Sequence, residues 1–356
     1  MSLPVSIVSQ QHPIPDRHLS LGLSAVTALA PMQDVTDLDF MNVIAEYGCP
    51  DYFFTEYFRV HETSRLDKPI LRSITENTTG KPIFAQMIGE SIPDLVRIAK
   101  LLSDYPVAGI DLNMGCPAPR IYRKNVGGGL LRDPDKIDRI LGELRANVAG
   151  RLTVKMRIGF EDTSEFDRVL TLIDKHNIDL LSLHGRTVRE AYHGAVHYEA
   201  IAQAVARLRC PVLANGNVSS ASTALAILSQ TQAAGVMIGR SAIRNPWIFS
   251  QIRQTLAGQE ITVVKLEQVR EYIDRLYHMP PAQAAPEKSR VSRLKMYLNY
   301  IGQSVDPEGE FLREMRRAKT EVELFDICDR YLLTNPQSVF SPEPYPGIFA
   351  RPKCED

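Results

Sequence analysis

Short runs of apolar and β-branched residues recur up to about residue 240, and a stretch with helical periodicity follows each of them. Such runs are typical of parallel strands covered by helices, because both faces of the strand are then buried. Successive runs begin 29, 30, 27, 43, 28, 31 and 24 residues apart, close to one strand, one helix and two loops. The predicted strands are 23–30, 52–56, 82–87, 109–113, 152–157, 180–184, 211–215 and 235–238. Eight such units predict a (β/α)8 TIM barrel.

Polar residues that commonly begin helices support this division. Asp37, Ser91, the pair Asp133 and Pro134, and Ser220 stand directly before helical patterns. An open doubly wound sheet is the competing architecture, but its first turn usually reads G-x-G-x-x-G, and here it reads PMQDVTD. The barrel is therefore preferred. The long fourth interval adds the segment CPAPRIYRKNVGGGLL, which in a barrel lies over the C-terminal mouth.

The strand pattern stops after Pro246, and only helical patterns follow, at 247–256, 263–278, 288–301, 310–317 and 321–333. We therefore expect a loose N-terminal leader (1–22), a barrel (23–257), an all-helical domain (258–334) and a proline-rich tail (335–356). The tail holds five prolines in 22 residues, which predicts a poorly ordered segment.

Composition narrows the class of protein. With 44% hydrophobic and 23% charged residues, the chain is typical of a globular protein. No window approaches 18 consecutive apolar residues and the leader has no apolar h-region, so we expect no membrane span and a cytoplasmic location. Five scattered cysteines without a C-x-x-C pair indicate reduced thiols and no metal site. The net charge of −1 gives no global attraction for nucleic acid, so a polyanion would have to bind to local basic patches.

Most predicted strands end in a residue that can bind or react. These are Gln33, Glu56, Gln86, Asn113, Lys155, Arg157, His184, Asn215 and Arg240. In a barrel such strand ends share one face, and a ring of buried polar groups there implies a polar ligand. The segments NGNV and IGR end the seventh and eighth strands, where barrels commonly bind phosphate. A phosphate site beside amide, ammonium and imidazole groups predicts flavin mononucleotide (FMN), with Lys155 near the pyrimidine edge.

An ordered set of motifs strengthens this interpretation. It comprises APM at 30–32, AQM at 85–87, DLNMGCPAP at 111–119, GGGLLRDP at 127–134, VKMRIG at 154–159, LHGRT at 183–187, NGNV and IGR. In these motifs the chain resembles the tRNA-dihydrouridine synthases, flavoenzymes that reduce uridine in tRNA. The resemblance implies an FMN barrel, NADPH as electron donor, and a helical domain that cradles tRNA.

The resemblance also assigns roles to residues. It places Cys116 as the general acid, and it implies that the residues in contact with FMN are Pro31, Met32, Gln86, Lys155, His184, Asn215, Gly216, Asn217, Gly239 and Arg240. A thiol suits the role, since its unperturbed pKa of about 8.5 keeps it mostly protonated yet able to donate. Pro117 and Pro119 predict a rigid start for the loop, and the glycines at 127–129 a flexible end that closes over the extruded base.

Contacts to RNA are expected from basic and aromatic residues. Asn113 and Arg157 are candidates near the base, and a positive track is expected from Arg120, Arg123 and Lys124 beside the loop to Arg290, Arg293 and Lys295 in the helical domain. Solvated helix faces are the alternative explanation for each basic cluster. The candidates for base stacking are Tyr57, Phe58, Tyr122 and Tyr192.

The leading hypothesis is therefore an FMN-dependent enzyme that reduces the C5–C6 bond of a tRNA uridine. An FMN oxidoreductase of the dihydroorotate dehydrogenase type, acting on a free pyrimidine, is a second possibility, although such an enzyme does not need the helical domain. A non-catalytic RNA-binding barrel is a third, and Cys116 and Lys155 argue against it. No protein partner is inferred.

Overall fold

The computed structural model describes residues 25–280 and 285–350. Its centre is a closed barrel of eight parallel strands: β1 (Val26–Leu29), β2 (Tyr52–Phe54), β4 (Ile83–Ile88), β5 (Gly109–Met114), β6 (Leu152–Arg157), β7 (Leu180–His184), β8 (Val212–Asn215) and β9 (Gly235–Ile238). The barrel closes where β1 pairs with β9, with Ala28 opposite Met237. The predicted TIM barrel is confirmed, and each predicted strand overlaps an observed one. The leader at 1–22 lies outside the described residues.

Side chains that point into the barrel change from apolar to polar along the strands. Because alternate residues of a strand share a face, Leu180, Ser182 and His184 of β7 point to the same side. Leu180 belongs to a small apolar cluster formed by Ala28, Ala30, Tyr52, Phe54, Phe84, Leu180, Leu213 and Met237. Further along most of the strands the same face carries polar groups such as Gln86 and Asn215. The barrel therefore has an apolar floor and a polar C-terminal mouth.

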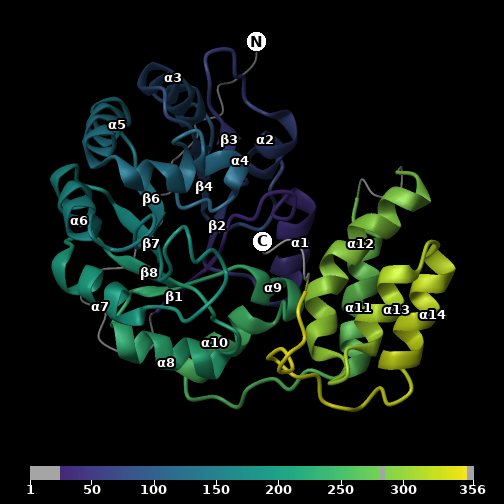
Figure 1. Ribbon diagram of the computed structural model, residues 1–356. Coiled ribbons are helices and arrows are strands. Elements are labelled where there is room, and N and C mark those ends of the chain that lie inside the picture. Colours follow the sequence, from purple (N-terminus) through teal and green to yellow (C-terminus); the bar gives the residue numbers. More distant parts are fainter. Residues whose placement is uncertain (1–24, 281–284, 351–356) are drawn as a thin grey trace, which may run out of the picture.

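Helices surround the barrel as the sequence predicts (Figure 1). They are α1 (Leu38–Tyr47), α2 (Lys68–Thr75), α3 (Ile92–Ser103), α5 (Pro134–Asn147), α6 (Phe166–Lys175), α7 (Tyr198–Arg207), α8 (Ala221–Thr231), α9 (Arg240–Arg244) and α10 (Ile248–Leu256). Asp37, Asp133 and Ser220 cap their helices by accepting backbone N–H bonds. Ser91 does not, because its hydroxyl bonds to the Asp94 carboxylate at 2.6 Å instead.

Two features depart from the simple repeat. A short strand, β3 (Phe58–Arg59), pairs with β4 where no strand was predicted. The insertion after β5 forms α4 (Pro119–Tyr122) and a 3-10 helix, η1 (Gly127–Arg132). Both elements of the insertion follow the C-terminal end of β5, so the insertion lies at the mouth, as predicted.

The helical domain consists of α11 (Leu266–Tyr277), α12 (Glu287–Ile301), the 3-10 turn η3 (Gly302–Ser304), α13 (Glu310–Arg317) and α14 (Glu321–Leu332). It lies to one side of the barrel, with α12 nearest to it (Figure 1). Phe40 of α1 stacks on Tyr297 of α12 with ring centroids 5.5 Å apart, and Tyr47 meets Tyr272 of α11 edge to face. No helix in the described part of the chain is both long and apolar enough to cross a membrane.

Residues 335–350 form what we call the C-terminal strap, which returns from α14 toward the barrel (Figure 1). Phe340 is buried, and its N–H donates to Val264 O at 2.8 Å. Further along, the Tyr345 N–H donates to Gln303 O at 2.8 Å. The expectation of a poorly ordered tail is therefore wrong for these residues. Prolines exclude regular helix and sheet, but the residues between them keep N–H groups, and all of them keep carbonyls, that can bond to other elements.

The strap also reaches the barrel. The Ser220 hydroxyl at the start of α8 donates to Glu343 Oε1 at 2.8 Å, and Arg244 Nε of α9 donates to Pro342 O at 3.3 Å. The Ser304 hydroxyl of η3 donates to Glu343 O at 2.8 Å. Glu343 thus joins the barrel to the helical domain.

The contribution of the strap to stability can be measured at Phe340. Phe340→Ala is expected to lower the free energy of unfolding by about 3 kcal/mol or more, because a 3% exposed ring leaves a cavity when it is removed. Val339→Ala is the matched control, since Val339 is 65% exposed and its truncation should change little. Urea unfolding of both variants tests this, and equal stabilities would mean that the strap does not pack in solution.

Candidate active site

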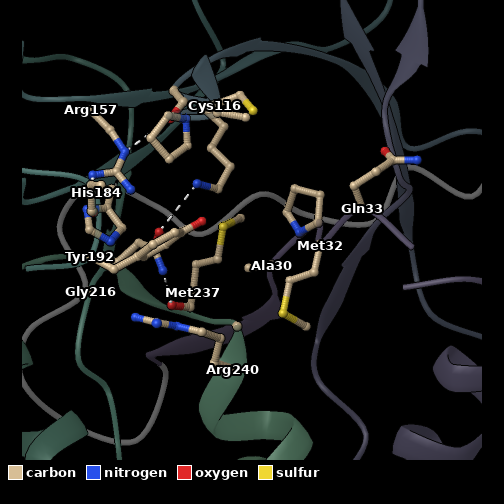
Figure 2. A pocket seen from close by; sticks show the side chains of 18 of the residues that line it. Ala30, Met32, Gln33, Cys116, Arg157, His184, Tyr192, Gly216, Met237 and Arg240 are labelled. Carbon is tan, nitrogen blue, oxygen red and sulfur yellow. Dashed lines mark hydrogen bonds between the residues drawn. The ribbon is translucent and has the colours of Figure 1, made fainter. Parts of the chain in front are cut away.

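A cavity of about 890 Å³ opens at the C-terminal mouth of the barrel. Its wall combines strand ends, the insertion after β5, the loop after β7, and two residues from beyond the barrel, Tyr300 and Ala350. Figure 2 shows Arg157, His184 and Tyr192 on one side, with Met32 and Gln33 on the other. The volume lies in the range of small-molecule and cofactor sites, which is about 300–1,000 Å³.

The structure brings most of the predicted cofactor residues together. Those on the cavity wall are Pro31, Met32, Lys155, His184, Asn215, Gly216, Asn217, Gly239 and Arg240. Gln86 is absent from the wall, because it is fully buried below it. Strand ends predicted separately from sequence therefore converge on a single site.

A chain of hydrogen bonds runs from the barrel interior to the loop of Cys116. The buried Asp111 carboxylate accepts from Thr153 Oγ1 at 2.6 Å and from Gln86 Nε2 at 2.7 Å. Gln86 Oε1 accepts from Asn113 Nδ2 at 2.9 Å, and Asn113 Oδ1 accepts from the Cys116 N–H at 3.0 Å. Burial raises the pKa of Asp111 to about 6, but the two donors favour its charged form. This chain fixes the amide groups of Gln86 and Asn113.

Lys155 brings an ammonium group into the cavity. Burial lowers its pKa to about 8, with the neighbouring Arg157 adding to the effect, and Asp111 opposing it. Its Nζ donates to Asn215 Oδ1 at 3.4 Å, and an ammonium group has three hydrogens to donate. The group is therefore suited to an anionic ligand.

His184 is held as the neutral imidazole. Burial lowers its pKa well below 6.5, and the nearby cations, Arg157 first among them, lower it further. Its Nδ1 is buried and has no hydrogen-bond partner within the described residues. A buried polar atom without a partner is costly, so a ligand that bonds to Nδ1 would satisfy it.

The segment after β8 has a backbone suited to close approach by a ligand. Gly216 has φ of +124°, where a side chain is strained, and a Cβ there would lie 3.0 Å from Val196. Asn217 follows at φ of +50°, and its Oδ1 accepts from Arg186 at 3.3 Å. Arg240 of the neighbouring strand end lies over the Tyr192 ring, 4.3 Å from its centroid. Gly216, Asn217 and the cation Arg240 therefore line the cavity together where the sequence predicts a phosphate.

Cys116 lies on the wall of the cavity in a loop that is closely packed. Burial raises the pKa of its thiol, so the proton is retained above the ordinary range. The glycines at 127–129 begin η1 and are buried. A Cβ at Gly128 would lie 2.5 Å from Val188 and one at Gly129 2.5 Å from Tyr122 O. The prediction of a flexible glycine end is therefore wrong: these glycines allow close packing.

The structure gives Arg157 a supporting position as well as a place on the wall. Its Nε donates to Gly115 O at 3.1 Å, and its Nη1 donates to Thr187 O at 2.8 Å and to Ala191 O at 2.6 Å. Burial lowers its pKa to about 10. Most of its donors thus hold the loops after β5 and β7.

The predicted RNA contacts divide into two groups. Arg120 lies on the cavity wall and Arg123 and Lys124 are exposed beside it. The cations of the helical domain have intramolecular partners instead. Arg290 bonds to Glu321 at 3.2 Å, Arg293 to Asp37 at 2.8 Å, and Lys295 donates to Arg316 O at 2.9 Å. The positive track expected between the loop and these three residues therefore stays a prediction, and in the helical domain its cations would have to exchange an intramolecular partner for a phosphate.

Three of the four predicted stacking residues, Tyr57, Tyr122 and Tyr192, lie on the cavity wall. Phe58 does not, because its side chain is 1% exposed in the core. Sequence reasoning also missed Asp111 and Arg186, although both stand inside the quoted motifs. Tyr300 and Ala350 had no local signal, since only long-range folding brings them to the cavity.

Comparison with known proteins agrees with this geometry. The family model described as dihydrouridine synthase matches residues 28–336. A probable tRNA-dihydrouridine synthase of Rhodobacter capsulatus is 34% identical over 243 residues, which cover 67% of this chain and 74% of that protein. The tRNA-dihydrouridine(16) synthase of Neisseria meningitidis is 28% identical over 311 residues, covering 85% of this chain and 93% of that protein. The matched range contains the barrel and the helical domain but leaves out nearly all of the C-terminal strap.

Proposed function

The chain belongs to the dihydrouridine synthase family, and from this premise we propose that it binds FMN in the cavity and reduces a uridine of tRNA to 5,6-dihydrouridine. NADPH is the proposed electron donor, and the cytoplasm the proposed location. The observation that carries the proposal is the meeting of Cys116, Lys155 and His184 on the wall of one cavity.

The residues present fit FMN. Its phosphate would lie near Gly216, Asn217 and Arg240, which line the cavity and could offer backbone N–H groups and a guanidinium. The neutral His184 and the ammonium of Lys155 would face its acceptors, which would give His184 Nδ1 the partner that it lacks in the described residues. Met32 would lie against its ring system. Gln86 would act from below through Asn113, because it does not reach the wall.

When bound, reduced FMN supplies the hydride for C6 of uracil. Cys116 then donates a proton to C5, and its raised pKa keeps that proton available at neutral pH. Asn113 holds the backbone of Cys116 in place by accepting its N–H. Arg157 holds Gly115 and the loop after β7 on the other side, which fixes the thiol relative to the cavity.

A direct assay tests this function. The purified protein should show a flavin visible spectrum, and with NADPH it should form dihydrouridine in unmodified tRNA, detected by mass spectrometry of the nucleosides. Position 16 is the first to map, because that number is in the name of the Neisseria meningitidis relative. A flavoprotein that reacts with free dihydroorotate or orotate but leaves tRNA unchanged would support the dihydroorotate dehydrogenase type instead. A protein that binds tRNA but cannot be loaded with flavin would support the non-catalytic alternative.

The RNA surface beside the loop gives a quantitative prediction. Replacing Arg120, Arg123 and Lys124 by glutamine should weaken tRNA binding. It should also reduce the slope of log affinity against log salt by about 0.7–0.9 for each phosphate that these cations no longer neutralise. A salt series of binding measurements tests this. The matched control replaces Arg168, Lys175 and Arg207, which are exposed cations on α6 and α7, by glutamine. This control variant should keep the wild-type slope. If both variants have the same slope of log affinity against log salt, the loop is not part of the RNA-binding surface.

A further inference from the structure

The C-terminal strap ends at the rim of the cavity. Ala350 lies on the cavity wall, as does Tyr300 of α12. The yellow strap runs beside α9 in this view (Figure 1), where Arg244 of α9 donates to Pro342 O at 3.3 Å. A segment that lies almost wholly outside the family match therefore completes part of the entrance.

The backbone of the strap is fixed where it reaches the rim. Arg316 of α13 donates through Nη2 to Phe349 O at 3.1 Å and to Ala350 O at 2.6 Å. Its Nε donates to Asn299 Oδ1 at 3.0 Å, which holds the guanidinium in place. Gln303 Nε2 donates to Ile348 O at 3.0 Å. The strap therefore presents its last described side chains from a fixed position.

Phe349 is exposed at this fixed position. Its side chain is 62% exposed, whereas the neighbouring Ala350 is 4% exposed against the cavity. A single exposed apolar residue is ordinary by itself. At the rim of an RNA-modifying site, however, a ring on a fixed backbone loses little conformational freedom when a base stacks on it.

The strap meets the start of α13 at the residue before Phe349. The side chain of Ile348 lies against Gly309, the residue before α13, because a Cβ added to Gly309 would be 3.0 Å from Ile348 Cδ1. The same Cβ would be 4.0 Å from Arg313 Nη1. The side chain of Arg313 is 51% exposed and pairs with Glu310, which is also exposed. An exposed ion pair of this kind is weak, so a phosphate can replace the carboxylate. The strap and α13 are neighbours, so they offer an exposed ring and an exposed guanidinium on adjoining segments. Aromatic rings and arginines are the groups that bind unpaired nucleotides.

We propose that the end of the C-terminal strap is part of the RNA-binding surface, with Phe349 stacking on a nucleotide of the tRNA next to the reactive uridine. This inference rests on the proposed function, because it requires tRNA at the cavity. It adds an RNA-binding residue from a segment that the family match does not include.

Binding of an unmodified tRNA transcript to the flavin-loaded protein tests the inference. Phe349→Ala should weaken binding about 5- to 150-fold, the range expected when one stacked base is no longer supported. It should raise the KM for tRNA while leaving the rate at saturating tRNA near that of the wild type. Phe349→Trp should retain binding. Val339→Ala is the matched control. Val339 is about as exposed as Phe349 and lies on the same strap, but it forms an isolated β-bridge with Lys265.

The outcomes separate this inference from the proposed function. If the wild type converts tRNA and Phe349→Ala binds and turns over like it, the strap does not bind RNA and only this inference is overturned. If the wild type converts no tRNA under any condition, the proposed function itself fails. Equal reductions in affinity for Phe349→Ala and Val339→Ala would indicate a general effect on the strap and would also overturn the inference.

Discussion

Cys116→Ala is expected to abolish dihydrouridine formation in tRNA while NADPH still reduces the bound flavin. The thiol lies on the cavity wall, and no other described cysteine does. Removal of a general acid typically costs about 10²- to 10⁴-fold in rate. FMN should remain bound, because alanine keeps the backbone N–H that Asn113 accepts. Single-turnover conversion of tRNA by enzyme reduced beforehand measures the effect.

The control and the pH dependence make this result specific. Cys49→Ala removes a cysteine that is not on the wall and should leave the rate unchanged. In the wild type, the proton is present below the thiol pKa and is lost as pH rises through it. Because burial raises that pKa, the single-turnover rate should hold through about pH 8 and fall only at higher pH. A variant that forms dihydrouridine at the wild-type rate would show that another group donates the proton.

Lys155→Met is expected to weaken FMN binding about 10- to 150-fold and to lower the reduction potential of the bound flavin. Methionine has a similar length but carries no charge, so the reduced, anionic ring loses its countercharge. Hydrogen bonds to charged groups contribute about 1.5–3 kcal/mol, which sets this range. Titration of the flavin-free protein with FMN and a redox titration of the loaded protein measure the two effects.

The flavin-free form of the same variant should change in the opposite direction. Burial lowers the pKa of Lys155 to about 8, so its charged form costs folding free energy at neutral pH, where the unfolded chain carries the same charge without penalty. Flavin-free Lys155→Met should therefore melt at a higher temperature than the flavin-free wild type at pH 7. Lys124→Met, at an exposed lysine, is the matched control and should change neither property. Unchanged FMN affinity and potential in Lys155→Met would place the flavin elsewhere.

The barrel and most of its site could be predicted because their signals are local. The repeat of strand and helix depends on the pattern of consecutive residues. Because parallel strands of a barrel end on one face, this pattern alone predicts that Asn113, Lys155 and His184 lie together. The caps at Asp37, Asp133 and Ser220 likewise depend on neighbours three residues away.

Long-range contacts explain what could not be predicted. Arg293 has the pattern of a free cation on a helix face, but folding brings it to Asp37, 256 residues away. The glycines at 127–129 have the composition of a flexible loop, yet they are required because Val188 and Tyr122 O lie too close for a Cβ. The proline-rich strap has the composition of a disordered tail, and only the distant Ser220 and Arg244 show where its carbonyls and carboxylate bind.

The position of the strap also has a consequence for the order of folding. The bond from Ser220 to Glu343 joins residues 123 apart in the chain, and Glu343 O also accepts from Ser304 of the helical domain. The two bonds can form together only after the barrel and the helical domain have each taken shape. We therefore expect this side of the cavity entrance to assemble last and to open first. The strap can detach without disturbing the barrel ladders, so its amides should exchange with solvent far sooner than those of β6 and β7. The entrance to the site is then less stable than the barrel that supports it.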